Sequence, residues 1–341
     1  MSNATVVGGI LRARYRIVQL IGEGGSGAVY AAEDMRLAGR LSAIKEIRPD
    51  PYATPAQMAQ AQTQFRREAM ILARLDHPNL PKVYDFFVED GRSYLVMDYV
   101  DGPDLRQLVD QARGRGEFLR ESTVLEWLSQ LLDALEYLHN QSPPVIHRDV
   151  KPANIKLTPQ GRIKLVDFGL VKPLDPEDPR TITVVRGVGS LPYTPLEQYG
   201  GADHTLPRSD IYAVGATLYH LLTGRIPVTA QQRFLEPQSL VAPRTLNPAI
   251  SPDVEKVIFS AMSMHPDQRP STVAELRAQL ESSTDGRDGG TGDDVWLRAL
   301  RDNLYLVVLV ALLLGLAIFA TARSAVSPST VTPTPIVTTF P

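Results

Sequence analysis

The sequence predicts an α+β protein with two lobes and one C-terminal transmembrane helix, and three observations lead to this prediction. Strand-like runs rich in Val, Ile, Tyr and Ala dominate residues 15–100. Amphipathic helical patterns dominate from Leu105 onward, and residues 304–322 form a run without a charge. A strand-rich segment followed by a helix-rich segment indicates two lobes with a cleft between them.

Sequence patterns set the expected elements of both lobes. Strands are expected at residues 15–24, 27–35, 42–47, 82–90 and 92–100, with Asp90-Gly91 as the hairpin turn between the last two. A helix is expected from Pro55 to Leu75, with an apolar stripe of Phe65, Met70, Ile71 and Leu75. Helices of the second lobe are expected at residues 124–140, 209–223, 251–264 and 271–281.

The composition excludes several classes of function. A hydrophobic fraction of 43% over 341 residues is ordinary for a globular chain. The net charge of −3 excludes the broad basic field of a nucleic-acid-binding protein. The absence of Cys excludes disulfides, thiolate zinc sites and a thiol nucleophile, and the six His form no His-x-x-x-His pair. Any chemistry must therefore use carboxylates, Lys, hydroxyls or a bound ion.

A glycine pattern, Gly22-x-Gly24-x-x-Gly27, stands between the first two expected strands. Glycines let a backbone approach phosphates closely, and their amides donate to phosphate oxygens. A plain glycine-rich hairpin is the alternative. A dinucleotide fold is excluded, because Val29 and Tyr30 continue a strand where a helix would have to begin.

Lys45 lies in an apolar strand, after Ala43 and Ile44. A Lys in such a position is costly unless it is paired. Glu68, on the helix that follows, is the candidate partner. The alternative is a Lys that snorkels outward from an edge strand.

The most informative segments are residues 145–154, VIHRDVKPAN, and 163–169, IKLVDFG. Asp149, Asn154 and Asp167 supply the hard oxygen ligands that Mg²⁺ accepts. Mg²⁺ keeps waters and phosphate oxygens in its coordination shell, so these residues favour a nucleotide substrate.

With these motifs in this order, residues 12–280 resemble a eukaryotic-like (Hanks-type) bacterial serine/threonine protein kinase. The resemblance implies the bilobal kinase fold, ATP and Mg²⁺ (or Mn²⁺) as cofactors, and protein Ser/Thr side chains as substrates. It also implies catalytic roles for four residues. Asp149 would orient the substrate hydroxyl and accept its proton, Lys151 would neutralise the γ-phosphate, and Lys45, held by Glu68, would bind the α/β-phosphates.

The resemblance assigns the remaining site residues in the same way. Asn154 and Asp167 would hold Mg²⁺. The nucleotide would contact Ile21, Gly22, Gly24, Gly27, Val29, Ala43, Asp98, Val100 and Asp104, with Met97 behind the adenine. Asp210 would brace the catalytic loop, and Arg269 would pair with Glu197. For Asp210, Arg269 and Glu197, the alternative is a purely structural ion pair, and the resemblance implies that same structural role.

The sequence departs from the family pattern at three places. Thr194-Pro195-Leu196-Glu197 replaces the usual Ala-Pro-Glu, and Ser190 replaces a commoner Thr while it retains the hydroxyl. These changes bear on substrate docking more than on phosphoryl transfer. Lys156 stands where an apolar residue usually floors the adenine pocket, and its stem could pack there while the ammonium snorkels outward.

The resemblance implies an activation segment at residues 167–197. Arg148, beside Asp149, predicts control by phosphorylation, because a phosphate on this segment could pair with it. Thr181 or Thr183 is the expected acceptor, by autophosphorylation in trans between two copies of the chain. The alternative is a constitutively ordered loop with ordinary threonines.

The run at residues 304–322 would span about 28 Å as a helix, close to the thickness of a bilayer core. A buried core helix is the alternative. Arg298 and Arg301 precede the run and only Arg323 follows it, so the kinase part is expected in the cytoplasm of a single-pass cell-membrane protein. Residues 281–303 would form a flexible linker and residues 323–341 a short extracytoplasmic tail rich in Ser, Thr and Pro.

Two rival functions share this fold. A membrane-tethered pseudokinase scaffold would bind nucleotide without catalysis, but the equivalents of Lys45, Asp149 and Asp167 are all present. A small-molecule phosphotransferase is disfavoured by the recognisable activation segment, which ends at Glu197. In protein kinases this segment normally forms the platform for a peptide substrate. Protein substrates, a second copy of the chain and the membrane are therefore the expected partners, and nucleic acid is not.

Overall fold

The computed structural model describes residues 6–24, 27–48, 52–167, 190–199 and 206–284. Backbone contacts divide the chain into two units, residues 1–283 and 284–341. Thr181, Thr183 and the predicted span at residues 304–322 lie outside the described residues. Within the part of the chain that the structure describes, no helix is both long and apolar enough to cross a bilayer.

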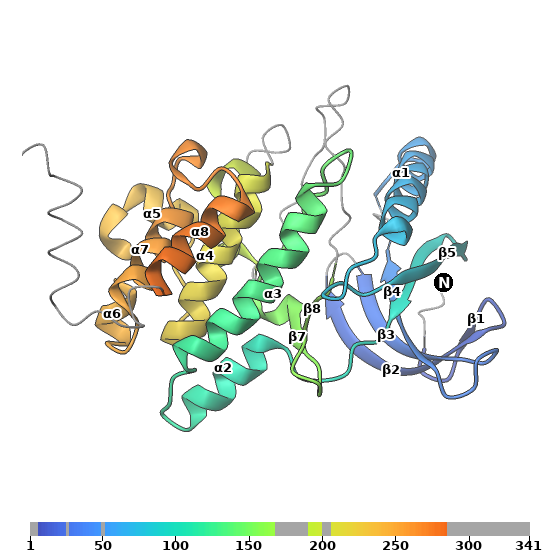
Figure 1. Cartoon of the computed structure of the whole chain (residues 1–341). Helices are drawn as coiled ribbons and strands as arrows, with labels where there is room; N and C mark the ends of the chain where they lie inside the picture. The colour runs from blue at the N-terminus through green and yellow to red at the C-terminus, as the bar shows by residue number, and fades with distance from the viewer. Residues whose placement is uncertain (1–5, 25–26, 49–51, 168–189, 200–205, 285–341) are drawn as a thin grey trace, which may run out of the picture. The chain divides into compact units, whose positions relative to one another are not determined.

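One antiparallel sheet forms the N-terminal lobe, in the strand order β1-β2-β3-β4-β6-β5 (Figure 1). Its strands are β1 (Ile10–Leu11), β2 (Tyr15–Gly24), β3 (Gly27–Asp34), β4 (Leu41–Ile47), β5 (Val83–Glu89) and β6 (Arg92–Asp98). The five predicted strands are confirmed, and β1 was not predicted. The predicted hairpin is also confirmed. Asp90 and Gly91 both have positive φ, 49° and 75°, as the tight turn between β5 and β6 requires.

Helix α1 (Pro55–Arg74) packs beside this sheet and begins with a capping box between Thr54 and Gln57. Its buried apolar residues are Phe65, Ala69 and Leu72, which follow the i, i+4, i+7 spacing of one helix face. The predicted stripe was wrong at Met70, which is 47% exposed because it lies one residue off this face.

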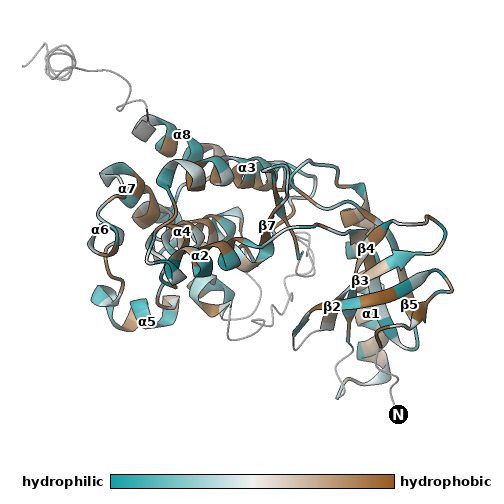
Figure 2. Cartoon of the chain, turned by 90° about the horizontal axis from the view of Figure 1, so that it is seen from below, coloured by the Kyte–Doolittle hydropathy of each residue, from teal (hydrophilic) through white to brown (hydrophobic). Residues whose placement is uncertain are grey.

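The C-terminal lobe is mainly helical. It contains α2 (Leu105–Gly114), α3 (Glu121–His139), α4 (Pro207–Thr223), α5 (Ala230–Leu235), α6 (Pro243–Leu246), α7 (Pro252–Ala261) and α8 (Val273–Thr284). The hairpin of β7 (Ile155–Leu157) and β8 (Ile163–Leu165) adds a second small sheet. Every residue of α4 from Ser209 to Thr223 is buried, whereas α7 carries polar and apolar residues on different faces (Figure 2). Helix α4 is therefore the central element of this lobe.

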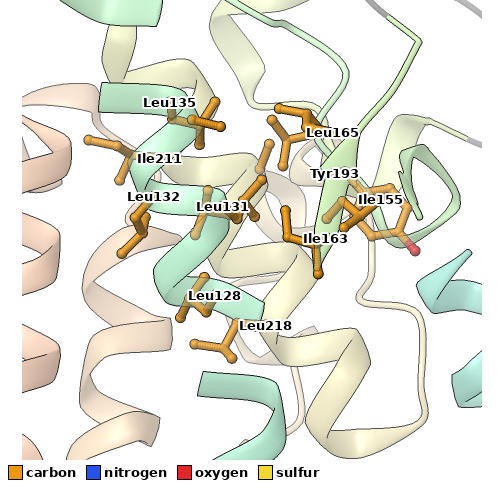
Figure 3. Packing of buried hydrophobic residues seen from close by; sticks show 14 of the residues in the cluster. Leu128, Leu131, Leu132, Leu135, Ile155, Ile163, Leu165, Tyr193, Ile211 and Leu218 are labelled. Atoms are coloured by element: carbon orange, nitrogen blue, oxygen red, sulfur yellow. The ribbon is translucent and has the colours of Figure 1, made fainter. Parts of the chain in front are cut away.

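The hydrophobic core joins α3, α4 and the β7–β8 hairpin (Figure 3). Its labelled members are Leu128, Leu131, Leu132, Leu135, Ile155, Ile163, Leu165, Tyr193, Ile211 and Leu218. The hairpin follows Asn154 directly and precedes Asp167 by two residues. Packing of the hairpin on α3 and α4 therefore fixes the backbone on which both polar residues stand.

Gly215 allows the close approach of α4 to α7. A Cβ at this position would lie 2.8 Å from the Cβ of Ala261 and 2.9 Å from the Cγ of Met262. We expect Gly215→Ala to lower the free energy of unfolding by about 1–3 kcal/mol, because the helices must move apart. Urea denaturation of the full-length protein measures this loss.

Gly114→Ala is the matched control, since no atom of the described residues lies within 4 Å of the Cβ it would add at the end of α2. It should be neutral or stabilise by about 0.4–1 kcal/mol. Equal stabilities of the two variants would contradict the close helix contact.

Candidate active site

The loop from His147 to Asn154 is fixed by a buried carboxylate of α4. Asp210 accepts hydrogen bonds from the backbone N–H groups of His147, at 2.9 Å, and Arg148, at 2.8 Å. His139 Nε2 lies 2.9 Å from the same carboxylate. Burial alone would raise the pKa of Asp210, but the contacts with His139 and His147 hold it below its usual value. Asp210 is therefore ionised and braces the loop. The contact of His139 with this carboxylate was not predicted from the sequence.

Asp149 is the centre of a charged cluster. Its two carboxylate oxygens accept from Lys151 Nζ at 3.0 and 2.8 Å. Asn154 Nδ2 donates to the Asp149 carboxylate at 2.9 Å and to its backbone oxygen at 2.8 Å. Lys151 also donates to Ser190 Oγ at 2.6 Å. The hydroxyl retained at Ser190 thus reaches the predicted catalytic Asp through Lys151.

Asp167 faces this cluster from the end of β8. It has positive φ, 60°, and its carboxylate forms an ion pair with Lys45. The positive charge of Lys45 lowers the pKa of Asp167 to about 2. Val166 N–H donates to the backbone oxygen of Asn154 at 2.8 Å, which places Asp167 close to Asn154.

The donor set at Asn154 and Asp167 suits a hard cation. Asn154 uses Nδ2 toward Asp149, so its Oδ1 is the atom that could bind a cation. A carboxylate and an amide oxygen are typical of Mg²⁺ sites completed by phosphate oxygens and water. Among the described residues, no group of three or more His, Cys, Asp or Glu forms a metal site by itself. The arrangement therefore fits Mg²⁺ that arrives with a phosphate ligand.

Lys45 lies in the interior of the sheet, because β4 is flanked by β3 and β6. The edge-strand interpretation of this residue was therefore wrong. Its side chain lines one small cavity together with Glu68, Phe65 and Leu95. Glu68 is 3% exposed and accepts from Gln64 Nε2 at 3.0 Å. The ion pair between Lys45 and Glu68 stays a prediction.

The glycine pattern occupies the hairpin between β2 and β3. Gly22 and Gly24 are exposed, and among the described residues no atom lies within 4 Å of a Cβ at either position. Gly27 is different, because its φ is 151° and a Cβ there would lie 1.8 Å from the backbone oxygen of Glu46. Of these three glycines, Gly27 alone is required by a close approach within the part of the chain that the structure describes.

The other predicted nucleotide contacts come from β2, β3, β4, β6 and the residues that follow β6. Ile21 is 44% exposed, Val29 is partly buried, and Ala43, Met97 and Val100 are buried. Asp98 N–H donates to Lys82 O, so of its two backbone groups only the carbonyl could contact a base. Asp104 caps α2 by accepting from Gln107 N–H at 2.8 Å, and Lys156 lies opposite Lys164 in the β7–β8 hairpin.

Gly102 was not singled out from the sequence. It has φ 111°, and a Cβ would lie 2.0 Å from the backbone oxygen of Leu157. The connection between the lobes therefore crosses directly against β7. The dipeptide Asp101-Gly102 was the available signal, because it marks a turn.

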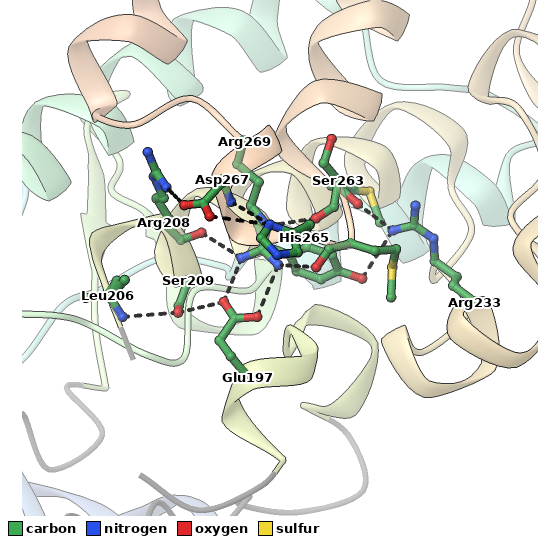
Figure 4. A network of polar contacts seen from close by, with 12 residues as sticks. Glu197, Leu206, Arg208, Ser209, Arg233, Ser263, His265, Asp267 and Arg269 are labelled. Carbon is green, nitrogen blue, oxygen red and sulfur yellow. Dashed lines mark hydrogen bonds and ion pairs between the residues drawn. The ribbon is translucent and has the colours of Figure 1, made fainter. Parts of the chain in front are cut away.

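Glu197 and Arg269 form a bidentate ion pair, with Nη–Oε distances of 2.6 and 3.1 Å (Figure 4). Ser209, at the start of α4, donates to the same carboxylate at 2.9 Å. Arg269 also donates to the backbone oxygens of Ser263 and Met264. The segment that contains Glu197 is thereby attached to α4 and to the region after α7, and Ser209 is a member that the sequence did not reveal.

A second unpredicted contact attaches the same segment to the other end of α4. Tyr193 Oη lies 2.7 Å from His220 Nδ1, and both residues are buried. Burial lowers the pKa of His220 to about 4, and burial raises the pKa of Tyr193. The imidazole is therefore neutral at pH 7 and accepts from the Tyr193 hydroxyl.

Among the regulatory candidates, only Arg148 is described. It has positive φ, 68°, and burial lowers the pKa of its guanidinium below the usual value. Its predicted partners Thr181 and Thr183 lie outside the described residues.

Residues 15–280 match the sequence family described as "Protein kinase domain". A probable serine/threonine-protein kinase of Streptomyces coelicolor is 36% identical over 292 residues, which cover 82% of this chain and 41% of that protein. The serine/threonine-protein kinase PrkC of Bacillus subtilis is 36% identical over 287 residues, which cover 82% of this chain and 42% of that protein. The chain thus spans about two-fifths of the length of these relatives.

Solved structures with the same fold include one described as "PpkA-294 apo form" and the PknI kinase domain of Mycobacterium tuberculosis. The first has a TM-score of 0.65 and 29% identity, and the second has 0.60 and 28%. Each comparison covers 82% of this chain and the whole of the solved chain. The similarity therefore extends over both lobes.

His220 predicts a pH dependence of stability. A histidine in the unfolded chain titrates near pH 6.5, and the folded protein resists its protonation down to about pH 4. The contribution is therefore fully present above about pH 6.5 and is lost as pH falls toward 4. Between pH 7 and pH 5 this residue alone should remove about 2 kcal/mol from the free energy of unfolding.

Urea denaturation at both pH values checks this expectation in the wild-type protein and in His220→Gln, whose amide oxygen can still accept from Tyr193. The variant should lose about 2 kcal/mol less between pH 7 and pH 5. Identical losses would show that His220 does not cause the dependence.

Proposed function

Because the chain belongs to the protein kinase family, we propose that it transfers the γ-phosphate of ATP to serine and threonine side chains of proteins. The observation that carries this proposal is the position of Asp149, whose carboxylate is held by Lys151 and Asn154 beside the Lys45–Asp167 ion pair. Relatives named as serine/threonine-protein kinases support the same reaction.

In the proposed mechanism, Asp149 orients the substrate hydroxyl and accepts its proton during transfer. Two hydrogen-bond donors fix this carboxylate, so its position requires no rearrangement when the substrate arrives. Lys151 lies within 3.0 Å of Asp149 and neutralises negative charge on the transferred group. Ser190 directs the Lys151 ammonium through its hydroxyl.

The nucleotide would lie between the glycine hairpin and the β7–β8 hairpin. Lys45 would exchange part of its contact with Asp167 for the α/β-phosphates, and Glu68 would hold the ammonium in place. Asn154 Oδ1 and the Asp167 carboxylate would hold Mg²⁺, which neutralises phosphate charge when it is bound. Since the pKa of Asp167 is about 2, its carboxylate is already ionised at neutral pH, and binding of Mg²⁺ would release no proton from it.

Control by phosphorylation is part of the proposal. A phosphate on Thr181 or Thr183 would pair with Arg148, whose buried position disfavours an uncompensated charge. A second copy of the chain would be the donor, in trans.

Mass spectrometry of the intact full-length protein after incubation with Mg-ATP tests the reaction. The wild-type protein should gain phosphate and modify a Ser/Thr peptide, and Asp149→Asn should be slower by about 10²–10⁴-fold. Phosphate that is added equally to both proteins would contradict the role of Asp149. A wild-type protein that binds Mg-ATP without any transfer would instead indicate a pseudokinase scaffold.

The same experiment tests the regulation. Mapped phosphate should lie on Thr181 or Thr183, and wild-type protein should phosphorylate Asp149→Asn when the two are mixed. Active protein with no phosphate at either threonine would contradict this part of the proposal.

We further propose that residues 304–322 anchor the chain in the cell membrane, with the kinase domain in the cytoplasm. The support is the charge-free run itself and the arginines that precede it. The chain has no Cys, so single cysteines introduced on either side of the run can be labelled without background.

In intact cells, a membrane-impermeant maleimide should label Ser327→Cys and should label Ser283→Cys only after lysis. The full-length protein should also remain in the membrane fraction after an alkaline carbonate wash, whereas a variant without residues 304–322 should be released. Release of the full-length protein, or the reverse labelling, would contradict the proposal.

A further inference from the structure

Glu46 is a buried carboxylate in the N-terminal lobe. Its side chain is fully buried, next to an apolar cluster that includes Ala28, Tyr30 and Tyr94. Arg92 Nη1 donates to Glu46 Oε1 at 2.8 Å, Arg48 Nε donates to the same oxygen at 3.1 Å, and Tyr30 Oη donates to Oε2 at 3.3 Å. A buried carboxylate with several donors has one well-defined position. Glu46 is therefore a fixed point on the strand that carries Lys45.

Arg48 extends this network to the glycine hairpin. Its Nη2 donates to Glu23 Oε1 at 2.7 Å, while its Nε remains on Glu46. Glu23 stands between Gly22 and Gly24, at the end of β2. One guanidinium therefore joins the hairpin to the fixed carboxylate, and its planar fork suits two acceptors at once.

The strand register explains why Arg48 can reach both carboxylates. Glu23 pairs with Ala28 of β3, and Ala28 pairs with Glu46 of β4. Ala28, which separates the two carboxylates in this cross-strand row, ends at Cβ. The adjacent row runs from Gly22 through Val29 to Lys45. A contact between Glu23 and Glu46 through Arg48 therefore sets the glycine hairpin relative to Lys45.

We propose that Glu23 and Arg48 are positioning residues that hold the glycine hairpin in register with Lys45 for nucleotide binding. This inference rests on the proposed function, because it assigns the hairpin to the nucleotide. The two side chains do not touch the reacting atoms; they act through the backbone of Gly22 and Gly24, the chain neighbours of Glu23.

The arrangement of these contacts allows an effect on nucleotide binding to be distinguished from a loss of global stability. Glu23 is exposed, with 52% of its side chain accessible, whereas the contacts of Glu46 with Arg92 and Tyr30 do not involve it. Glu23→Gln therefore removes the charge at the hairpin and leaves the buried part of the network intact. Its effect on global stability should be small.

The test compares Glu23→Gln, Arg48→Met and the double variant in the full-length protein. Glu23→Gln should raise the Kd and the KM for Mg-ATP about two- to fivefold, as expected for the loss of a partly exposed ion pair, with little change in kcat. The double variant should bind Mg-ATP no more weakly than Arg48→Met, because Arg48→Met already breaks the contact with Glu23 that Glu23→Gln weakens. Amide hydrogen exchange at residues 20–30 without nucleotide should become faster in Glu23→Gln.

Glu117→Gln is the matched control, because Glu117 forms an exposed ion pair with Arg115, at 3.0 Å, in the turn that follows α2. It should change neither the Kd nor the exchange at residues 20–30. Conservative Arg48→Lys should restore part of the affinity that Arg48→Met loses.

Unchanged exchange at residues 20–30 in Glu23→Gln would overturn the inference, whether or not the wild-type protein binds nucleotide. Additive effects on the Kd in the double variant would overturn it as well. A wild-type protein that binds Mg-ATP but transfers no phosphate would contradict the proposed function alone, since the exchange and the Kd still report on the hairpin.

Discussion

The site depends first on the burial of Asp210 in α4. This carboxylate lies in a helix that is buried along most of its length, so it requires donors, and it finds them in the backbone of His147 and Arg148. The loop that carries Asp149 has no regular hydrogen bonding of its own beyond a short 3₁₀ turn at Pro152–Asn154. Its conformation is therefore imposed by α4.

The first and last turns of α4 both contact the segment from Ser190 to Glu197. Ser209, in the first turn of α4, contacts Glu197, and His220, in the last turn, contacts Tyr193. Ser190 then reaches Lys151 through its hydroxyl. Asp149 is thus linked to α4 by two independent routes, one through the backbone of its own loop and one through Lys151 and Ser190.

The sequence predicted most of the fold because hydrophobic periodicity and turn residues act locally. Asp90-Gly91 and the strands around it are examples, since their pattern requires no knowledge of distant residues. Met70 shows the limit of this reasoning. A shift of one residue along a helix moves a side chain around the helix axis and toward another face. Only the position of the sheet decides which side of α1 is covered.

The same difference between local and long-range contacts decides which parts of the site could be predicted from the sequence. Asp149, Lys151 and Asn154 lie within six residues, so their proximity was evident from the sequence. The pairing of Lys45 with Asp167 joins residues 122 positions apart, so it depends on how the two lobes meet and not on a local pattern. Tyr193 and His220 gave no signal, because a buried Tyr and a buried His are each ordinary in a core and only their contact is informative.

Buried charges have one structural effect in both lobes. Asp210, Arg269 and Glu46 each lie in or beside a regular element, and each accepts or donates hydrogen bonds that join this element to another segment of the chain. Well-packed apolar residues could supply comparable stability, since desolvation offsets much of the attraction within a buried ion pair. An apolar side chain, however, has no directional bond with which to fix a loop. The directional contacts of these three residues therefore join the loop from His147 to Asn154, the segment from Ser190 to Glu197 and Glu23 of β2 to the regular elements beside them.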